Sequence, residues 1–172
     1  FHVFCMPFLG ETTLADLEKP NEAEALRILE LLGEAVSHAH DRGVIHNDIK
    51  PANVLFHDRQ PMLLDFNLAA DTTQQRGSQV GGTLTYMAPE SLQKLVEGEQ
   101  NKDARSDIYS LGVLTFELVR GRPLFSKSAD PHTALTERKA VQSFQSQNCA
   151  SASVRAILQK CIAHDPSERY QT

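Results

Sequence analysis

Residues 106–123, SDIYSLGVLTFELVRGRP, are the stretch that most restricts how this chain can fold. Apolar side chains recur there at helical spacing and also occupy most of the other sides. The recurring positions are Ile108, Leu111, Leu114 and Leu118. Ser106 is a candidate N-cap, and Gly121 followed by Pro123 should end the helix. Because a helix that is apolar nearly all round is buried, we expect the rest of the domain to pack around this one.

The composition is compatible with a core of that kind. The chain has 172 residues, of which 41% are hydrophobic and 23% are charged, as in soluble globular domains. A formal net charge of -5 disfavours a general nucleic-acid or anionic-membrane binder, although a local basic groove stays open. We therefore expect no nucleic-acid partner and no membrane contact from this segment. The odd set Cys5, Cys149 and Cys161 has no C-x-x-C spacing, which predicts reduced, part-buried thiols.

A second long helix is predicted after Pro20. Asn21 can cap it, Glu24 three residues later can complete a capping box, and Gly43 can close it. One stripe at helical spacing should face the core. It consists of Leu26, Leu29, Gly33, Val36 and His40 (or Ala39).

Shorter elements fill the remainder of the chain. Two further helices are predicted around residues 134–145 and 152–163. FHVFCMPF, residues 1–8, predicts a short strand that Pro7 must end or place at an edge. The apolar pieces VIH, NVLF and MLLDF suggest small strands or loops that frame a site. Polar, non-periodic loops are predicted at residues 71–82 and 97–104.

The two ends of the sequence carry no targeting signal that we recognise. No run approaches the roughly 18 apolar residues of a membrane-spanning helix, and no secretory leader pattern is present. The chain starts with FHVFC, without Met, and stops at ERYQT, so we expect it to be an excerpt of a longer protein. We expect that protein to be cytoplasmic, or to lie on the cytoplasmic face of a membrane if it is anchored.

HNDIKPAN, residues 46–53, brings a carboxylate, an ammonium group and an amide close together in the chain. Asp48 could orient an acceptor hydroxyl and take its proton, and Lys50 could neutralise charge on a phosphoryl group. Asn53 and Asp65 offer the hard oxygen ligands that a magnesium-bound phosphate needs. Taken singly, each residue is equally compatible with a solvated loop, and Asp65 with a buried capping role. Together they suggest phosphoryl transfer.

Four motifs in order strengthen that hypothesis: H-x-D-x-K-P-x-N, a D-F dipeptide, GTLTYMAPE and SDIYSLG. The series closely resembles the signature set of the eukaryotic-like Ser/Thr protein kinases and covers nearly the whole chain. The resemblance implies the C-terminal lobe of the α+β kinase fold, from the hinge onward. This lobe is mainly α, a helical bundle around a central helix with small β-hairpins at the catalytic cleft. Residues 1–172 would then lack the N-terminal lobe and the C-terminal end of the domain, and would catalyse little alone.

The same resemblance implies roles at the reaction centre. Asp48 is the catalytic-loop aspartate, Lys50 the companion lysine of the Ser/Thr branch, and Thr83 the threonine that bridges these two residues. Asn53 and Asp65 are magnesium ligands. The implied cofactors are ATP and Mg²⁺, with Mn²⁺ as a substitute. The implied partner is a protein substrate with a Ser or Thr acceptor.

Five further residues have structural roles by resemblance. His46 and Phe66 match stacked residues of the regulatory spine, where core packing leads to the same expectation. Glu90 and Arg169 match a buried ion pair that pins the end of the activation segment. Asp107 matches an aspartate that hydrogen-bonds the catalytic-loop backbone from the central helix. The alternative for Asp107 is an acidic residue favoured in the first turn of a helix.

MPFL, near the start of the chain, resembles the hinge that receives adenine. Met6 would be the gatekeeper, and the carbonyl group of Pro7 and the backbone of Leu9 would bind the edge of the base. Leu55 would pack under the adenine ring. The ribose contact is expected at Glu11 or Thr12. The alternative is an edge strand with core Met and Phe side chains.

Two residues depart from the kinase pattern. Asn47 replaces the arginine that usually precedes the catalytic aspartate, and a neutral amide cannot bind an activation-segment phosphate as arginine does. Asn67 replaces the glycine of D-F-G, a mild change because asparagine tolerates left-handed backbone conformations. Asn67 is expected in the activation and substrate segment with Thr83 and Tyr86. No G-x-G-x-x-G loop and no V-A-I-K lysine occur in the sequence.

Two alternatives to a protein kinase stay open at this point. A pseudokinase would keep the fold as a binding or scaffolding module. The presence of Asp48, Lys50, Asn53 and Asp65 counts against it, whereas the two asparagine substitutions count mildly for it. A kinase-like small-molecule phosphotransferase is disfavoured by GTLTYMAPE, which resembles a peptide-docking segment.

Overall fold

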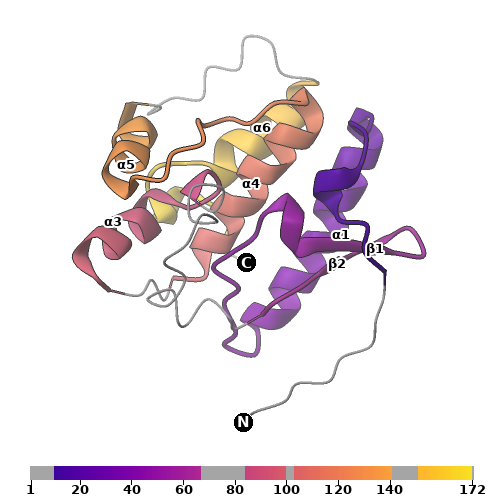
Figure 1. Cartoon of the computed structure of the whole chain (residues 1–172), viewed down its shortest axis with the longest axis horizontal. Helices are drawn as coiled ribbons and strands as arrows, with labels where there is room; N and C mark the ends of the chain where they lie inside the picture. The colour runs from indigo at the N-terminus through magenta and orange to yellow at the C-terminus, as the bar shows by residue number, and fades with distance from the viewer. Residues whose placement is uncertain (1–9, 67–83, 100–102, 141–150, 172) are drawn as a thin grey trace.

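The computed structural model describes residues 10–66, 84–99, 103–140 and 151–171 (Figure 1). The longer elements are α1 (Glu22–His40), β1 (Val54–His57), β2 (Gln60–Leu63), α3 (Pro89–Glu97), α4 (Arg105–Arg120), α5 (Pro131–Ala140) and α6 (Ala152–Cys161). Single 3-10 turns are η1 (Leu14–Asp16), η2 (Pro51–Asn53) and η4 (Pro166–Glu168). The described chain is thus mainly helical with one small hairpin, as predicted. None of its helices is long and apolar enough to cross a membrane.

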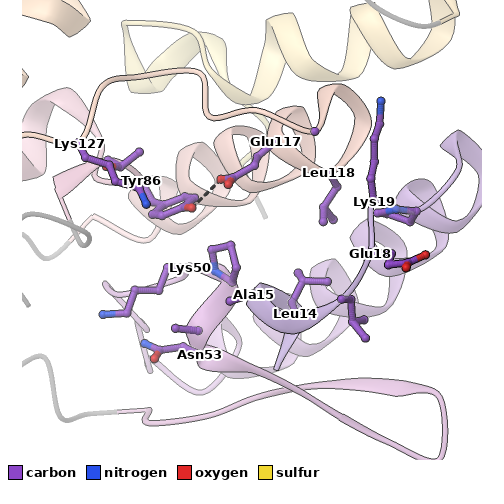
Figure 2. Close-up of a pocket in the computed structure, with 16 residues that line it drawn as sticks. Leu14, Ala15, Glu18, Lys19, Lys50, Asn53, Tyr86, Glu117, Leu118 and Lys127 are labelled. Atoms are coloured by element: carbon purple, nitrogen blue, oxygen red, sulfur yellow. Dashed lines mark hydrogen bonds between the residues drawn. The ribbon is translucent and has the colours of Figure 1, made fainter. Parts of the chain in front are cut away.

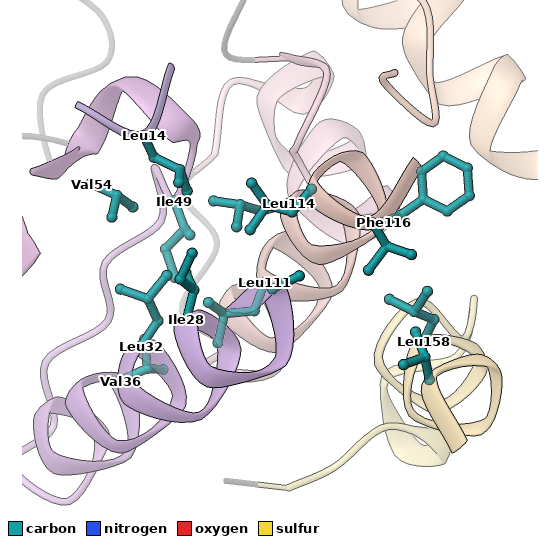
Figure 3. Packing of buried hydrophobic residues seen from close by; sticks show 14 residues of the cluster. Leu14, Ile28, Leu32, Val36, Ile49, Val54, Leu111, Leu114, Phe116 and Leu158 are labelled. Carbon is teal, nitrogen blue, oxygen red and sulfur yellow. The ribbon is translucent and has the colours of Figure 1, made fainter. Parts of the chain in front are cut away.

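Helix α4 is the buried centre of this arrangement, as its sequence predicted. Thirteen of its 16 residues are buried. Helices α1 and α6 both pack against it, and their apolar side chains meet those of α4 in one cluster (Figure 3). The cluster includes Ile28, Leu32 and Val36 from α1, Leu111 and Leu114 from α4, and Val154 and Leu158 from α6. Full burial of one such side chain contributes about 1.5–3 kcal/mol to the stability of the fold. Because α4 has apolar side chains around most of its circumference, it gains this stability only with neighbours on several sides.

The start of α4 differs from the prediction, whereas its end agrees. The helix begins at Arg105 with Ala104 as N-cap, so the cap predicted at Ser106 was wrong. Asp103 accepts hydrogen bonds from the backbone N–H of Arg105 at 3.0 Å and from its guanidinium at 2.7 Å and 2.9 Å. This local pair starts the helix before Ser106, whose hydroxyl donates to the carbonyl oxygen of Asp103 at 2.8 Å. Gly121 ends the helix in the left-handed conformation, with φ 67°.

Helix α1 has the predicted capping box but a different buried face. Asn21 Oδ1 accepts from the N–H of Glu24 at 3.0 Å, and the Glu24 carboxylate accepts from the N–H of Asn21 at 3.1 Å. The most buried stripe is Ala25, Ile28, Leu32 and Val36. Leu26 and Leu29 are only partly buried beside it. Both stripes are largely apolar, so periodicity could not distinguish them, and the packing of α4 and β2 on α1 decided between them.

The hairpin confirms a strand at NVLF, whereas the second strand contains only Met62 and Leu63 of MLLDF. β1 and β2 pair antiparallel from Val54 opposite Leu63 to His57 opposite Gln60. The two turn residues Asp58 and Arg59 have φ values of 49° and 61°, as the tight turns that match strand twist require. This register places the residues after Leu63 next to the end of η2.

The described residues include only part of the segments for which the other helices, strands and loops were predicted. α5 and α6 confirm the two shorter helices, although residues 141–145 lie outside the described residues, as do the strand at 1–8 and the loop at 71–82. Cys161 is a free, buried cysteine, and burial raises the pKa of its thiol to about 11. Cys5 and Cys149 also lie outside the described residues.

The contact between α4 and α6 leads to a matched pair of stability predictions. A Cβ on Gly112 would lie 2.6 Å from Cβ of Cys161 and 2.8 Å from Cγ2 of Ile162. We expect overpacking by Gly112→Ala to cost about 1–3 kcal/mol, which the alanine helix propensity of about 1 kcal/mol offsets only in part. Gly33→Ala on α1, where nothing lies within 4 Å, should instead stabilise by about 0.5–1 kcal/mol. Urea denaturation checks both variants, and a stabilising Gly112→Ala would contradict the close packing of these helices.

Candidate active site

The site is anchored on the first turn of α4 by Asp107. This carboxylate is buried, and it accepts hydrogen bonds from the backbone N–H groups of His46 and Asn47, both at 2.8 Å. Nε2 of His40, at the end of α1, lies 2.9 Å from the same carboxylate. Three partners compensate the cost of burying the charge. Asp107 therefore holds the backbone immediately before Asp48.

Asn47 has a conformation and a contact that its residue type explains. Its φ is 63°, in the left-handed region that asparagine tolerates better than most residues. Its side-chain Oδ1 lies 3.4 Å from the hydroxyl of Ser106 at the start of α4. The amide is thus part of the junction between this loop and α4.

Asp48 lies between Lys50 and Asn53, the residues with which it was grouped from the sequence. Lys50 Nζ donates to Asp48 Oδ2 at 2.7 Å. Asn53 Nδ2 donates to the same oxygen at 2.9 Å and to the Asp48 carbonyl at 2.8 Å. The η2 turn, which starts at Pro51, bends the chain so that Asn53 returns to Asp48. The Asp48 side chain is 24% exposed, so a molecule in the adjoining space can reach its carboxylate. The hydrogen bonds from Lys50 and Asn53 fix the position of this carboxylate.

The hairpin brings Asp65 beside Asn53. The N–H of Leu64 donates to the carbonyl of Asn53 at 2.9 Å, one residue beyond the pairing of Val54 with Leu63. Asp65 follows with a φ of 61° and an exposed side chain. An amide and a carboxylate oxygen from these two residues fit Mg²⁺, which prefers a few protein oxygens and keeps phosphate and water in its shell. Among the described residues, no three His, Cys, Asp or Glu side chains are grouped to hold a metal.

His46 connects the two halves of the site. Its Nδ1 accepts from the N–H of Asp48 at 3.3 Å, and its Nε2 lies 2.8 Å from the carbonyl oxygen of Leu64. The ring of Phe66 packs edge-to-face on the imidazole, with centroids 4.7 Å apart and an interplanar angle of 62°. The buried His46 thus ties the Asp48 loop to the segment that carries Asp65.

A cavity of about 700 Å³ adjoins Lys50 and Asn53 (Figure 2). Leu14 and Leu118 contribute apolar walls, and Thr85 and Tyr86 line it as well. The Tyr86 hydroxyl donates to Glu117 at 2.5 Å. Burial, with this carboxylate, raises the pKa of Tyr86 far above its usual range. Tyr86 is therefore a neutral, oriented phenol in the cavity wall.

Glu90 and Arg169 form the ion pair expected from the sequence. The contact is bidentate, with distances of 2.6 Å and 2.8 Å between guanidinium nitrogens and carboxylate oxygens. The Arg169 side chain is fully buried, and Glu90 is 22% exposed. The remaining Arg169 donors bind the carbonyl oxygens of Ala163, Arg105 and His164. All five guanidinium donors therefore have acceptors, and the pair ties the first turn of α3 to the C-terminal end of the described chain.

The other residues predicted for the site fall into two groups. Leu55 is buried in β1 and bridges to Thr13, so the segment after the predicted hinge runs beside β1. The residues outside the described part of the chain are Met6, Pro7, Leu9, Asn67 and Thr83. Their roles stay predictions.

Three residues that contact the site received no functional role from the sequence. His40 appeared only as part of a helical stripe, yet it contacts Asp107. Glu117 holds Tyr86, and Arg138 binds the backbone next to Tyr86. Each lies more than 30 positions from its partner, and no local motif predicts such contacts.

Comparisons with known proteins agree with these features. Residues 2–172 match the family model described as "Protein kinase domain". The chain is 36% identical over 155 residues to the serine/threonine-protein kinase PrkC of Bacillus subtilis, which covers 87% of this chain and 23% of that protein. It is 29% identical over 178 residues to the serine/threonine-protein kinase PknB of Mycobacterium leprae, covering 97% of this chain and 28% of PknB. Aurora kinase A-B of Xenopus laevis is 31% identical over 180 residues, covering 98% of this chain and 42% of that protein. The chain thus spans less than half the length of each of these relatives.

Proposed function

This chain belongs to the protein kinase family, as its motifs predicted, and we propose that it forms the C-terminal lobe of an active Ser/Thr protein kinase. The proposed reaction moves the γ-phosphoryl group of ATP to a Ser or Thr hydroxyl of a protein. The observation that carries the proposal is Asp48, held by Lys50 at 2.7 Å and Asn53 at 2.9 Å beside the cavity. Such a carboxylate suits the orientation of an acceptor hydroxyl.

Each residue of this site has a separate proposed role in phosphoryl transfer. Asp48 accepts the hydrogen bond of the acceptor hydroxyl and takes its proton as the bond from oxygen to the γ-phosphorus forms. The bond from the γ-phosphorus to the bridging oxygen breaks, and ADP leaves with the electron pair. Lys50 places a cation beside Asp48, where negative charge gathers on the transferring group. Bound Mg²⁺ would neutralise phosphate charge, and Asn53 and Asp65 would hold it.

The nature of the acceptor follows from two features. Lys50, two residues after the catalytic aspartate, is the pattern of Ser/Thr kinases, and PrkC and PknB, two of the relatives above, carry that name. Thr85 and Tyr86 line the cavity, where a peptide that presents a hydroxyl to Asp48 would lie. The contact of Asn47 with Ser106 gives this departure a structural role, which is compatible with an active kinase.

The proposal can be tested with the full-length protein. Incubation with Mg²⁺ and ATP labelled at the γ-phosphate, in the presence of peptide libraries with a single Ser, Thr or Tyr, should label Ser or Thr peptides. ATP binding without transfer to any acceptor would instead support a scaffolding role. Transfer mainly to Tyr peptides would contradict the assignment drawn from Lys50.

The contacts of Asn47 lead to a prediction about regulation. Asn47 carries no charge, and its amide lies near Ser106 rather than offering a cation to a phosphate. We therefore expect the protein with Thr72, Thr73 and Ser78 all replaced by Ala to retain its phosphoryl-transfer rate, measured on unphosphorylated enzyme. The Ser106→Ala variant serves as a control, because it should not create a need for phosphorylation. Loss of activity in the triple variant would show that a phosphorylated segment is required after all.

A further inference from the structure

Arg138 of α5 is a buried cation that the proposed reaction does not use. Its side chain is 0% exposed, and the nearest carboxylate oxygen, on Glu137, lies 3.4 Å away. Nη1 donates to that oxygen, and the other guanidinium nitrogens bind the backbone of another segment. Nη2 donates to the carbonyl oxygens of Leu84 at 2.6 Å and Thr85 at 2.8 Å, and Nε donates to that of Met87 at 3.4 Å. The ring of Phe125 covers the guanidinium at 3.6 Å from its centroid.

The segment that Arg138 contacts, Leu84–Met87, has one internal backbone hydrogen bond, from the N–H of Met87 to the carbonyl of Leu84 at 3.3 Å, and side chains bind all four of its carbonyl groups. The carbonyl that Arg138 does not reach, that of Tyr86, accepts from the hydroxyl of Ser110 on α4 at 2.9 Å. Side chains of α4 and α5 therefore bind four consecutive carbonyl groups. Because Thr85 and Tyr86 line the cavity beside Lys50, these bonds set the position of a cavity wall relative to Asp48.

The choice of arginine at this buried position is informative. Removing a cation from water is costly, and a well-packed apolar side chain of similar size is often neutral or stabilising in its place. Arginine has a planar fork that can bind several carbonyl oxygens at once and stack on a ring, which lysine cannot reproduce. Its geometry therefore matches the task of holding an irregular backbone segment better than the task of general packing.

We propose that Arg138 is a positioning residue that fixes Leu84–Met87 as the acceptor-side wall of the site. It acts through the backbone of this segment and touches neither ATP nor the reacting atoms. The kinetic consequence rests on the proposed kinase function. If the segment moves, an acceptor peptide should bind less well, whereas ATP should bind as before.

The test compares Arg138→Met and Arg138→Lys with Arg122→Lys in the full-length protein. Arg122 also lies over an aromatic ring, that of Phe116 at 5.9 Å, but it is exposed and serves as the matched control. We expect Arg138→Met to raise KM for an acceptor peptide by about tenfold or more, which is what loss of one charge-assisted hydrogen bond gives. KM for ATP and the slow hydrolysis of ATP without acceptor should stay at wild-type values. The KM of Arg138→Lys for the acceptor peptide should lie between those of the wild type and Arg138→Met. Arg122→Lys should have wild-type values.

A second measurement follows the segment without relying on activity. Hydrogen exchange of the amides at residues 84–88 should accelerate in Arg138→Met and less in Arg138→Lys, with exchange in α1 unchanged. The proposal would be overturned if KM for the acceptor peptide and KM for ATP rose equally. Unchanged hydrogen exchange at residues 84–88 would also overturn it. If Arg138→Met does not fold, Arg138→Lys decides by the same criteria. A wild-type protein that transfers no phosphate would refute the proposed function, while exchange would still decide whether Arg138 positions this segment.

Discussion

Asp48→Asn is expected to lower the rate of phosphoryl transfer by about 10²–10⁴, the usual contribution of a general base. Asparagine keeps the shape of the side chain and can still occupy the space between Lys50 and Asn53. It cannot take a proton from an acceptor hydroxyl, and it removes the negative charge that lies 2.7 Å from Lys50 Nζ. Single-turnover transfer at saturating ATP and acceptor measures the effect on the chemical step itself.

A matched control separates the loss of a base from the loss of a surface charge. Asp58 lies in the hairpin turn with its side chain 90% exposed, and asparagine suits its left-handed φ of 49°. Asp58→Asn should therefore leave the transfer rate unchanged. ATP affinity should be close to wild type in both variants. An undiminished rate in Asp48→Asn would remove Asp48 from the chemistry.

Glu90→Ala should have the largest effect on stability, lowering the free energy of unfolding by about 3–5 kcal/mol, as the loss of one partner of a buried ion pair does. The variant leaves the fully buried Arg169 guanidinium without the two carboxylate oxygens at 2.6 Å and 2.8 Å. The three carbonyl oxygens that remain cannot neutralise its charge. The free energy of unfolding of an ordinary domain is about 5–15 kcal/mol, so this loss is a large part of the total stability.

Glu97→Ala, in the same helix, is the comparison for this variant. Glu97 is 41% exposed, and its carboxylate lies 3.6 Å from Lys94 Nζ. Water and salt screen exposed pairs of this kind so that they contribute little to stability, and the removal of Glu97 should therefore change stability little. Chemical denaturation monitored by circular dichroism gives both values. Similar effects of the two substitutions would mean that the Glu90 pair is no more important than a surface contact.

Local features of the sequence predicted most of the secondary structure. The α1 capping box joins Asn21 and Glu24, three positions apart, and the left-handed Gly121 ends α4. Such contacts involve neighbouring residues, so their residue types alone indicate them. The errors arose where two local solutions competed. Helix α4 begins at Arg105, which Asp103 binds, rather than after Ser106, and one of two adjacent apolar stripes on α1 became the buried face.

The sequence by itself determined the family and the central helix, and it indicated the residues proposed here for phosphoryl transfer. Motif spacing and helical periodicity are properties of short segments, and they are present in the chain before it folds. Only the tertiary structure decided that Asp107 meets His40 across 67 positions, and that Arg138 reaches Leu84 across 54. Contacts of this kind form between segments that the folded core brings together. They leave no periodic trace in the sequence because the intervening residues do not take part in them.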